Sequence, residues 1–508
     1  LAECRIFLKL GGNAEMIRPN LNMFQLRTFL CEYKEDITMI KGTELFVKAL
    51  KEEGVTTLFG YPGGQAIDLF DALYDQDEID VVLPRHEQAL IHAADGYARS
   101  TGKVGVCLVT SGPGATNLVT GIATANYDSV PLVCFTGQVP LNLMGNDAFQ
   151  EVDMVGICRS ICKYAVTVRK REDLGRIIKE AFYIARTGRP GPVVVDLPKD
   201  IQQAMGSEEY PKEISIRSYK PNENVHSGQI KRAAGILKKA KKPLFLVGGG
   251  VNISGANEAM TKLVEKTGAP IITTIMGKGA VSSKHPLYLG NIGIHGSYAA
   301  NHAVSECDVL FSIGTRFNDR ITGKISEFAP NATIVHIDID SASISKNIVV
   351  DVPIVADAKL AIEALLEQME PLSIDGWVKE VKEWKEQYPI NMNKYDGLTP
   401  EKVIRYINEN YEHPIITTDV GQNQLWATQY FDIESNRQFL TSGGLGTMGY
   451  GFPAAIGAKL GNPDADVIAI SGDGGMQMNI QEMATAVALE LPLTLIVFNN
   501  GYLGNVRQ

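Results

Sequence analysis

The chain has 508 residues, of which 45% are hydrophobic and 21% charged, so it can bury large cores and we expect two to four domains. A net charge of −10 argues against a nucleic-acid-binding protein, which needs a basic face. No apolar run reaches the roughly 18 residues that span a bilayer. The seven cysteines are scattered and lack the paired spacing of a zinc site, which fits a reducing, cytoplasmic setting.

The first 38 residues differ in character from the rest of the chain. They mix acidic and basic residues without an apolar centre, so they match neither a signal peptide nor a transit peptide. We interpret residues 1–38 as a non-native or disordered extension ahead of Met39. The alternative is a docking arm.

A first α/β domain is predicted over residues 39–205, where short apolar runs alternate with helical patterns. Thr43 is expected to cap its first helix, and Glu87 opens an alanine-rich helix. The expected strands cover residues 57–60, 80–83, 104–110, 131–136 and 193–197. Glycine-rich turns follow two of these strands, at residues 61–64 and 111–117. The alternation implies a parallel sheet covered by helices on both faces.

A polar linker over residues 206–227 leads to a second α/β domain, predicted over residues 228–365. Its expected strands cover residues 243–247, 271–274, 309–313 and 333–339. Gly248, Gly249 and Gly250 follow the first of them, which would let a dinucleotide approach the backbone closely. Alone, these glycines could form only a flexible turn. A charged stretch at about residues 366–397 precedes the next domain.

The third predicted domain, residues 398–508, carries the most informative pattern of the chain. Apolar strands at residues 467–470 and 493–498 end at the sequences Ser-Gly-Asp-Gly-Gly and Asn-Asn, respectively. Asp473 and Asn500 therefore lie at the carboxyl ends of two neighbouring parallel strands, where open α/β sheets bind ligands. Their oxygens suit Mg²⁺ bound to a diphosphate. Because the chain stops soon after this strand, we expect the C-terminal part of this domain to be missing.

A glycine-rich turn alone is more often a tight strand-to-helix connection. The Gly-Asp-Gly turn combined with Asn-Asn after the next strand resembles the thiamine-diphosphate motif. Further motifs resemble the catalytic subunit of acetohydroxyacid synthase (acetolactate synthase), and this resemblance runs from about residue 39 to residue 508. These motifs lie at residues 61–64, 84–88, 112–117, 147–151, 188–192, 197–200, 316–324 and 443–449.

The resemblance implies a fold of three doubly wound parallel-sheet α/β domains, which bind the pyrimidine, FAD and the diphosphate in chain order. Residues 316–324 resemble the biosynthetic, FAD-containing enzymes. The implied reaction is decarboxylation of pyruvate on thiamine diphosphate and addition of the hydroxyethyl carbanion to pyruvate or 2-oxobutyrate, in valine, leucine and isoleucine biosynthesis. The implied assembly is a homodimer or larger, with active sites between subunits and a small regulatory subunit.

By this resemblance, Glu87 is the catalytic glutamate, which bonds a pyrimidine ring nitrogen and promotes proton removal from the thiazolium carbon. The structural alternative is a carboxylate that stabilises a helix start. Gly64, Phe149, Gln150 and Lys199 are implied to surround the substrate. Taken alone, Lys199 could be a solvated loop lysine and Phe149 a core aromatic.

The resemblance also assigns cofactor and channel residues. The implied thiamine diphosphate contacts are Val420, Gly421, Gln422, Asn423, Gly446, Met448, Gly474 and Gly475. The implied Mg²⁺ ligands are Asp473, Asn500 and the backbone carbonyl of Tyr502. The implied FAD contacts are Arg189, Gly248, Gly249, Gly250, Thr274, His295, Arg316, Asp338 and Asp357. The implied substrate-channel residues are Ile294, Asp319 and Arg320.

Three positions depart from the family pattern. Gln65 stands where alanine is common, and Ile294 and Asn505 stand where methionine is common. The tryptophan that the family uses to prefer 2-oxobutyrate as acceptor is expected just beyond residue 508, so the acceptor preference stays open. Two rival enzymes are a thiamine-diphosphate pyruvate oxidase and a 2-oxo acid decarboxylase. A non-catalytic binding module is disfavoured because Glu87, Asp473 and Asn500 are all present.

Overall fold

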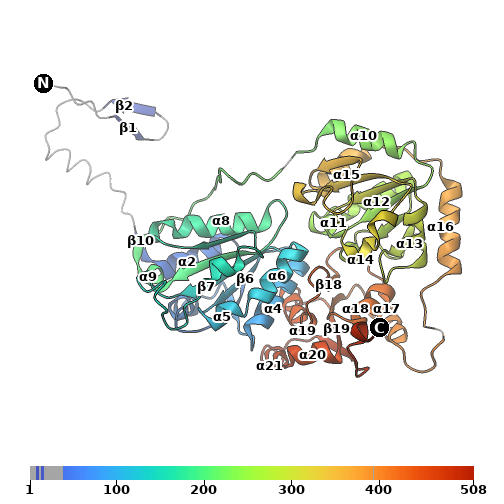
Figure 1. The fold of residues 1–508 in the computed structure, drawn as a ribbon. Helices are drawn as coiled ribbons and strands as arrows, with labels where there is room; N and C mark the ends of the chain where they lie inside the picture. Colours follow the sequence, from blue (N-terminus) through green and yellow to red (C-terminus); the bar gives the residue numbers. More distant parts are fainter. Residues whose placement is uncertain (1–6, 11–12, 17–37, 223, 393) are drawn as a thin grey trace, which may run out of the picture.

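A computed structural model describes residues 7–10, 13–16, 38–222, 224–392 and 394–508. Figure 1 shows three α/β bodies, with the first domain at the left, the central domain at the upper right and the third domain below them. Strands β1 (Phe7–Leu10) and β2 (Asn13–Met16) form an antiparallel pair, and the rest of the expected N-terminal extension lies outside the described residues. None of the described helices combines the length and the apolar character needed to cross a membrane.

The first domain is built on a six-stranded parallel sheet of order β5-β4-β6-β7-β9-β8. Its strands are β4 (Thr57–Tyr61), β5 (Asp80–Val82), β6 (Gly105–Val109), β7 (Leu132–Gln138), β8 (Tyr164–Thr167) and β9 (Val193–Pro198). Its helices are α2 (Gly42–Glu52), α3 (Ile67–Tyr74), α4 (Glu87–Thr101), α5 (Pro113–Thr116), α6 (Val119–Asp128), α7 (Met154–Cys158), η1 (Arg171–Asp173), α8 (Leu174–Arg186) and α9 (Lys199–Gln203). Strands β3 (Met39–Lys41) and β10 (Met205–Ser207) pair beside it.

Two separate hydrophobic cores cover the two faces of this first sheet. Helices α2, α3 and α8 bury one face, and α4, α6 and α7 bury the other. Every residue of β6 and β7 is buried, because both faces of these central strands are covered. Continuous apolar runs of this kind are typical of parallel strands in doubly wound sheets.

The central domain repeats this architecture with the sheet order β13-β12-β11-β14-β15-β16, again parallel throughout. Its strands are β11 (Pro243–Val247), β12 (Ile271–Thr273), β13 (Tyr288–Asn291), β14 (Val309–Ile313), β15 (Thr333–Asp338) and β16 (Val352–Val355). Its helices are α10 (Ser227–Leu237), α11 (Gly249–Ile253), α12 (Asn257–Thr267), η2 (Ile275–Gly277), α13 (Tyr298–Glu306), α14 (Asp319–Thr322), η3 (Ile325–Glu327), η4 (Ser341–Ser343), α15 (Ala358–Leu366) and α16 (Asp375–Gln387).

The third domain has a four-stranded parallel sheet of order β18-β17-β19-β20. Its strands are β17 (Ile415–Thr418), β18 (Phe439–Thr441), β19 (Val467–Gly472) and β20 (Thr494–Phe498). Its helices are α17 (Pro400–Asn410), α18 (Gln422–Tyr430), α19 (Gly451–Gly461), α20 (Asp473–Met478), η5 (Ile480–Glu482), α21 (Met483–Ala488) and α22 (Gly504–Arg507). Helices α17 and α18 bury one face and α19 the other. Three doubly wound parallel-sheet domains confirm the expected fold class.

Several local predictions were wrong. Thr43 does not cap the first helix, because α2 already begins at Gly42 and Thr43 is buried within it. The charged stretch before the third domain contains α16, whose Trp377 and Val381 are buried in the central core. Eight of the described strands were missed, namely β1, β2, β3, β8, β10, β13, β16 and β18.

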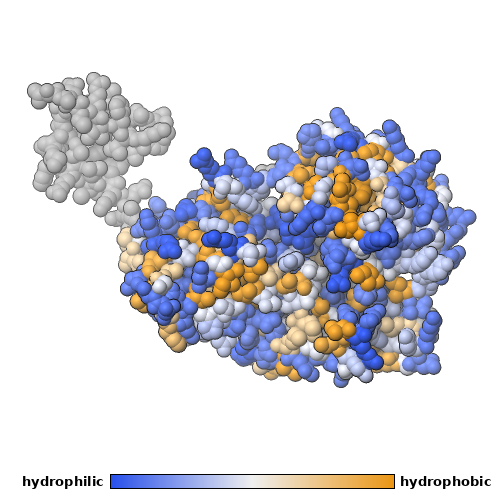
Figure 2. All heavy atoms as spheres, viewed as in Figure 1, coloured by the Kyte–Doolittle hydropathy of each residue, from blue (hydrophilic) through white to orange (hydrophobic). Residues whose placement is uncertain are grey.

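The first and third domains meet where α4 packs against α19, near the middle of Figure 1. A Cβ atom placed on Gly96 would lie 2.1 Å from the Ala454 carbonyl oxygen, and one on Gly457 would lie 1.8 Å from that of Ala93. Glycine at these two positions therefore allows the two helix backbones to touch. Figure 2 shows a mostly hydrophilic face, with hydrophobic side chains gathered over parts of the first and central domains.

Candidate active site

Each of the three sheets reverses its strand order at an inner point, and glycine-rich turns meet there. The reversal lies between β4 and β6 in the first sheet, between β11 and β14 in the central sheet, and between β17 and β19 in the third. Open α/β sheets bind ligands at such points, beyond the carboxyl ends of the strands. The molecule therefore has one candidate ligand site in each domain.

In the third domain, the turn after β17 packs tightly against the turn after β19. A Cβ atom placed on Gly475 would lie 2.4 Å from Asp419 Oδ1, so the close approach of the two turns requires glycine there. Gly421 has a φ of +142°, and Asn423 Nδ2 donates to the Asp419 carbonyl at 2.8 Å. Helix α18 begins at Gln422, so its N-terminal amides face this point. Such an arrangement favours a diphosphate.

Asp419 organises these turns, although the sequence had not marked it as a site residue. Its carboxylate accepts hydrogen bonds from the backbone amides of Val420 (2.8 Å), Gly449 (3.0 Å) and Gly451 (3.1 Å). Burial raises the pKa of Asp419, and the three amides act in the opposite direction. A buried carboxylate with several backbone donors is a structural clamp, and it fixes the loop that begins α19.

The loop over residues 441–449 carries the predicted Gly446 and Met448. Gly446 has a φ of +75°, which favours glycine, and it lies beside Val420. Met448 is partly buried, and its Cε lies 3.6 Å from the place where a Cβ atom on Gly474 would stand. The structure thus brings Met448 against the Gly-Asp-Gly turn.

The predicted metal ligands surround the ends of β19 and β20, whose last residues Gly472 and Phe498 are paired. Asn500 Oδ1 accepts from the Tyr502 amide at 3.0 Å, and Asn500 Nδ2 donates to Gln422 Oε1 at 2.9 Å. These bonds orient the Asn500 amide and leave its oxygen one lone pair for a cation. One carboxylate, Asp473, and neutral oxygens fit Mg²⁺ that also binds phosphate oxygens. Within the described residues, no cluster of three or more His, Cys, Asp or Glu side chains suits a metal ion.

Glu87 is the first residue of α4, at the carboxyl end of the first sheet. Asn117 Nδ2 donates to Glu87 Oε2 at 2.9 Å, and the preceding residue, His86, caps the helix by accepting from the Gln88 amide at 3.0 Å. Glu87 Oε1 faces the glycine turn, since a Cβ atom placed on Gly114 would lie 3.4 Å from it. Asn117 thus fixes one carboxylate oxygen, and the Glu87 side chain is partly exposed.

The predicted substrate residues lie in the first domain, where Gly64, Phe149 and Gln150 are on loops and Lys199 begins α9. Lys199 Nζ donates to the Gly64 carbonyl at 2.8 Å and lies 3.9 Å from Asp68 Oδ2. Gln150 adopts a left-handed φ of +59°, and its backbone packs on Gly112. Phe149 is 84% exposed, so the core-aromatic alternative is wrong for it.

Among the described residues, the predicted residues of the two halves of the thiamine site are not hydrogen-bonded to one another. In the part of the chain that the structure describes, no hydrogen bond or ion pair connects Glu87, Gly64 or Lys199 with the turns around Asp473 and Asn500. The nearby link is structural, because the Arg85 amide donates to both carboxylate oxygens of the buried Glu482 at 3.0 and 3.1 Å.

A cavity of about 410 Å³ lies between all three domains, at the reversal point of the central sheet. Seven cationic side chains line it, which are Arg99, Arg186, Arg189, Lys278, Arg316, Arg320 and Arg437. Three carboxylates, Asp128, Asp338 and Asp357, also line it. An excess of cations in a glycine-lined cavity suits an anionic dinucleotide.

Most of the predicted FAD residues line this cavity. The cavity-lining members are Arg189, Gly249, Gly250, Thr274, Arg316, Asp338 and Asp357. Gly248 lies one residue outside the lining and contacts Gly314, and His295 also lies outside it, with its carbonyl accepting from Gln429. The Gly250 amide donates to the Gly314 carbonyl at 3.0 Å, which closes the floor of the cavity.

The charged groups of the cavity wall are strongly affected by burial. Arg189 is held by Ser129 Oγ (2.9 Å), the Asn126 carbonyl (2.9 Å) and Asp340 Oδ2 (3.2 Å). Burial and the nearby Arg189 cation lower the pKa of Arg316. Burial raises the pKa of Asp338 to about 6. Two guanidinium groups placed close together favour an anion between them.

The predicted channel residues lie at the outer rim of the central domain. Ile294 is 61% exposed, and its amide donates to the Arg320 carbonyl at 3.1 Å. Asp319 and Arg320 form an exposed ion pair at 3.7 Å. Arg320 also lines the cavity, so the rim and the cavity are continuous.

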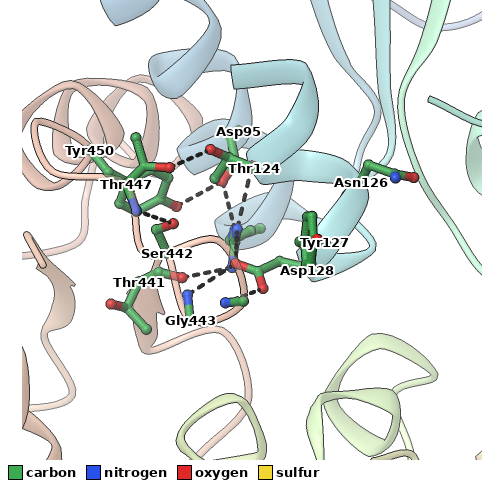
Figure 3. A network of polar contacts seen from close by, with 12 residues as sticks. Asp95, Thr124, Asn126, Tyr127, Asp128, Thr441, Ser442, Gly443, Thr447 and Tyr450 are labelled. Carbon is green, nitrogen blue, oxygen red and sulfur yellow. Dashed lines mark hydrogen bonds and ion pairs between the residues drawn. The ribbon is translucent and has the colours of Figure 1, made fainter. Parts of the chain in front are cut away.

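Sequence reasoning missed a polar network where the first domain meets the third (Figure 3). Arg99 pairs with Asp95 at 2.6 Å and with Asp128 at 2.9 Å, and Tyr450 donates to Asp95 at 2.7 Å. The four-residue spacing of Asp95 and Arg99 on α4 was the available signal, because it places both on one helix face. Their partners lie far along the chain, so the network could not be found from spacing alone.

Three family models match the chain in the order of its domains. The N-terminal TPP binding domain of thiamine pyrophosphate enzymes matches residues 40–157, the central domain matches residues 230–365, and the C-terminal TPP binding domain matches residues 419–508. These matches identify the chain as a member of the thiamine-diphosphate-binding enzymes. The glycine-rich turns described above lie within the matched domains.

Curated relatives agree. The chain is 50% identical over 484 residues to the probable acetolactate synthase large subunit of Methanocaldococcus jannaschii, covering 92% of this chain and 82% of that protein. It is 49% identical over 495 residues to the corresponding protein of Methanococcus aeolicus, with the same coverage. It is 46% identical over 481 residues to the acetolactate synthase isozyme 3 large subunit of Escherichia coli, covering 92% of this chain and 84% of that protein. The chain belongs to the acetolactate synthase large-subunit family of thiamine pyrophosphate enzymes.

Proposed function

We propose that this protein catalyses the acetolactate synthase reaction of branched-chain amino acid biosynthesis. It decarboxylates pyruvate and joins the two-carbon fragment to a second 2-oxo acid, which gives 2-acetolactate from pyruvate or 2-aceto-2-hydroxybutyrate from 2-oxobutyrate. The observation that carries the proposal is the high identity to acetolactate synthase large subunits over 92% of the chain. Glu87, Asp473 and Asn500 stand at strand or helix ends where that chemistry needs them.

Glu87 is assigned the proton-transfer role. When bound, thiamine diphosphate supplies a thiazolium ring that acts as the electron sink for decarboxylation. Glu87 would hold a proton at a ring nitrogen of the aminopyrimidine through its freer oxygen, Oε1. Asn117, bonded to Oε2, would fix the orientation of the carboxyl group. This division of the two carboxylate oxygens supports Glu87 as the acid–base residue.

The diphosphate and its metal are assigned to the third domain. Val420, Gly421, Gln422, Asn423, Gly474 and Gly475 would surround the diphosphate, and Gly446 and Met448 would hold the pyrimidine. Asp473, Asn500 and the Tyr502 carbonyl would bind Mg²⁺. The oriented Asn500 amide and the close approach of Gly475 to Asp419 support this assignment.

FAD is assigned to the cavity between the domains. The glycine turn at the reversal of the central sheet and the excess of cationic side chains support it. Arg189, Gly249, Gly250, Thr274, Arg316, Asp338 and Asp357 would contact FAD. Gly248 and His295 are weaker candidates because they lie outside the cavity lining.

The substrate is assigned to the loops near Glu87. Gly64, Phe149, Gln150 and Lys199 would surround it, and Lys199 would pair with the carboxylate of a 2-oxo acid after giving up its bond to the Gly64 carbonyl. Ile294, Asp319 and Arg320 would form the mouth of the channel.

A homodimer or larger assembly is part of this assignment. The resemblance of the site residues to the family implies that the Glu87 and the Asp473 of one active site come from different copies of the chain. The relatives are named large subunits, which supports a small regulatory subunit as a further partner. A cytoplasmic location stays a prediction from the cysteines.

Identification of the product tests the proposal. Purified protein is supplied with Mg²⁺, thiamine diphosphate, FAD and pyruvate, and the product is identified by NMR. Acetolactate is expected, and adding 2-oxobutyrate then measures the acceptor preference. Acetaldehyde would instead indicate a decarboxylase, and acetate formed with oxygen consumption would indicate a pyruvate oxidase.

A further inference from the structure

The loop that carries Gly446 and Met448 is held from outside its own domain. Helix α6 of the first domain contacts it at two places, through Asp128 at the start of the loop and through Thr124 nearer its end (Figure 3). Asp128 accepts from the Gly443 amide at 3.1 Å and from the Gly444 amide at 2.8 Å. Thr124 Oγ1 lies 2.7 Å from Thr447 Oγ1.

Asp128 is itself fixed by a partly buried cation. Arg99 NH2 donates to Asp128 Oδ2 at 2.9 Å, and Arg99 NH1 donates to the Thr441 carbonyl at 3.0 Å. Arg99 is fixed in turn by Asp95, which also accepts from the Tyr450 hydroxyl at 2.7 Å. Asp95, Asp128 and Tyr450 are each at most 6% exposed. Charge-assisted bonds shielded from water in this way hold backbone strongly.

The same residues form part of the wall of the cavity assigned to FAD. Arg99, Asp128, Gly443 and Gly444 all line it. Gly444 has no room for a side chain, because a Cβ atom there would lie 2.6 Å from Asp128 Oδ1. A molecule in the cavity therefore touches one end of the loop, and the thiamine pyrimidine touches the part of the loop around Gly446.

We infer that Asp128 is a positioning residue for thiamine diphosphate and couples occupancy of the FAD cavity to thiamine affinity. Asp128 contacts the beginning of the loop, and Thr124 contacts it near Thr447, so the two contacts restrict the segment between them before the cofactor binds. Filling the cavity immobilises Asp128 and Gly443 further, which reduces the ordering cost of thiamine binding. The inference rests on the proposed function, because it needs both cofactors.

The coupling must be reciprocal if it exists. An occupant of the cavity that raises thiamine affinity by some factor must gain the same factor in its own affinity when thiamine is bound. We expect FAD to lower the Kd of thiamine diphosphate about fivefold or more in the wild-type protein, since couplings between two binding sites are typically about 5- to 150-fold.

The test compares Asp128→Asn with the wild-type protein. The variant keeps the shape of the side chain. One carboxylate oxygen, which accepts from Arg99 and Gly443 or from Gly444, becomes an NH2 group that can only donate, and the other becomes a neutral acceptor. We expect the Kd of thiamine diphosphate with Mg²⁺, measured by isothermal titration calorimetry, to rise about tenfold, and the effect of FAD on it to disappear. The KM for thiamine should rise with it, whereas kcat at saturating cofactor should change little.

The matched control is Asp196→Asn. Asp196 is also a buried carboxylate of the first domain, bonded to Thr136, Gln138 and Thr167, but it has no bond to the loop. The Asp196→Asn variant should bind thiamine diphosphate as the wild type does. If Asp128→Asn does not fold, Thr124→Val tests the other contact and should raise the Kd about threefold, since it removes the hydrogen bond to Thr447 as well as one to the Thr120 carbonyl within α6.

The outcomes separate this inference from the proposed function. Wild-type affinity in Asp128→Asn, equal loss in Asp196→Asn, or an unchanged FAD effect in Asp128→Asn would each overturn the positioning role while the proposed function stands. A wild-type protein that forms acetolactate but shows no FAD effect on thiamine affinity would overturn the coupling. A wild-type protein that binds no thiamine diphosphate would overturn both.

Discussion

At the scale of single residues, Glu87 is the side chain on which the proposed chemistry depends most. We expect Glu87→Gln to lower kcat by about two to four orders of magnitude, because the amide can no longer exchange a proton with the pyrimidine. Thiamine binding and the circular dichroism spectrum should stay near those of the wild type. Steady-state kinetics with pyruvate measures the effect.

Glu258→Gln provides the control for that measurement. Glu258 is an exposed residue of α12 that pairs with Lys262, so its replacement should leave kcat unchanged. Wild-type turnover in Glu87→Gln would remove Glu87 from the mechanism and restore the reading of a simple helix-start carboxylate.

His92 makes the protein sensitive to acid. It is fully buried on α4 with no hydrogen-bond partner at either ring nitrogen, and its ring lies 5.5 Å from that of Tyr450. Burial and the nearby Arg99 cation lower the pKa of His92 to about 3. The unfolded chain binds a proton here below about pH 6.5, whereas the folded chain does not. Stability from neutral His92 is therefore complete above pH 6.5 and decreases as the pH falls.

Replacement of His92 should remove this pH dependence. Between pH 7 and pH 5, the wild type should lose up to about 2 kcal/mol of unfolding free energy more than His92→Leu, from the cost of about 1.4 kcal/mol per pH unit. Urea denaturation at a series of pH values measures the difference. Parallel stability curves for the two proteins would show that His92 does not contribute.

The sequence allowed some site residues to be placed but not their supports. Asp473 and Asn500 could be placed because each directly follows an apolar strand, and neighbouring parallel strands end at one edge. Asp128 and Asp419 could not be placed, because they act by accepting hydrogen bonds from the backbone amides of Gly443, Gly444 and Gly449. Nothing in the local pattern around a buried aspartate reveals which distant amides it will bind.

At the scale of elements, the contact between α4 and α19 is the tightest helix pair between domains. Gly457→Ala would place a Cβ atom 1.8 Å from the Ala93 carbonyl oxygen, so the helices would have to separate. We expect a loss of about 1–3 kcal/mol in unfolding free energy, which is typical of overpacking. The midpoint of thermal unfolding should fall accordingly.

Gly235→Ala is the matched control. Gly235 lies in α10, and a Cβ atom there would have no neighbour within 4 Å. This change should be neutral or should stabilise the protein by up to about 1 kcal/mol, because alanine is the better helix former. Equal melting temperatures for the two variants would contradict the close packing of α4 on α19.

The clearest sequence patterns belong to strands that are buried on both faces. Strands β6, β11 and β19 were found because their apolar runs are continuous. The missed strands have weaker patterns for physical reasons. β8 is half-buried along its length, β18 has three residues, and β16 contains Pro353 at a sheet edge, where proline is tolerated.

At the scale of the whole molecule, the arrangement of the domains could not be read from the sequence. The cavity depends on side chains of all three domains, and no local pattern indicates that Arg99 and Arg437 will line one wall with Asp338. The resemblance implied only that two copies share an active site. Substitution of Glu87 and of Asp473 in separate copies of the chain makes this implication testable.

Complementation between two inactive variants tests the shared site. Glu87→Gln lacks the acid–base residue, and Asp473→Asn lacks the charged metal ligand, so each homodimer should be inactive. If each site takes Glu87 from one copy and Asp473 from the other, a mixed dimer contains one site with both changes and one site with neither. Random assembly at equal amounts should therefore restore about one quarter of the wild-type activity, because half of the dimers are mixed and each has one intact site.

Co-expression of the two variants with different affinity tags, followed by two-step purification of the mixed species, makes the measurement independent of the mixing ratio. The purified mixed dimer should show about half of the wild-type kcat per dimer. Its Kd for thiamine diphosphate should be normal at one site. If each chain instead completed its own site, every site of the mixed dimer would carry one of the two changes. Activity no higher than that of the two separate variants would then show that Glu87 and Asp473 act in the same copy.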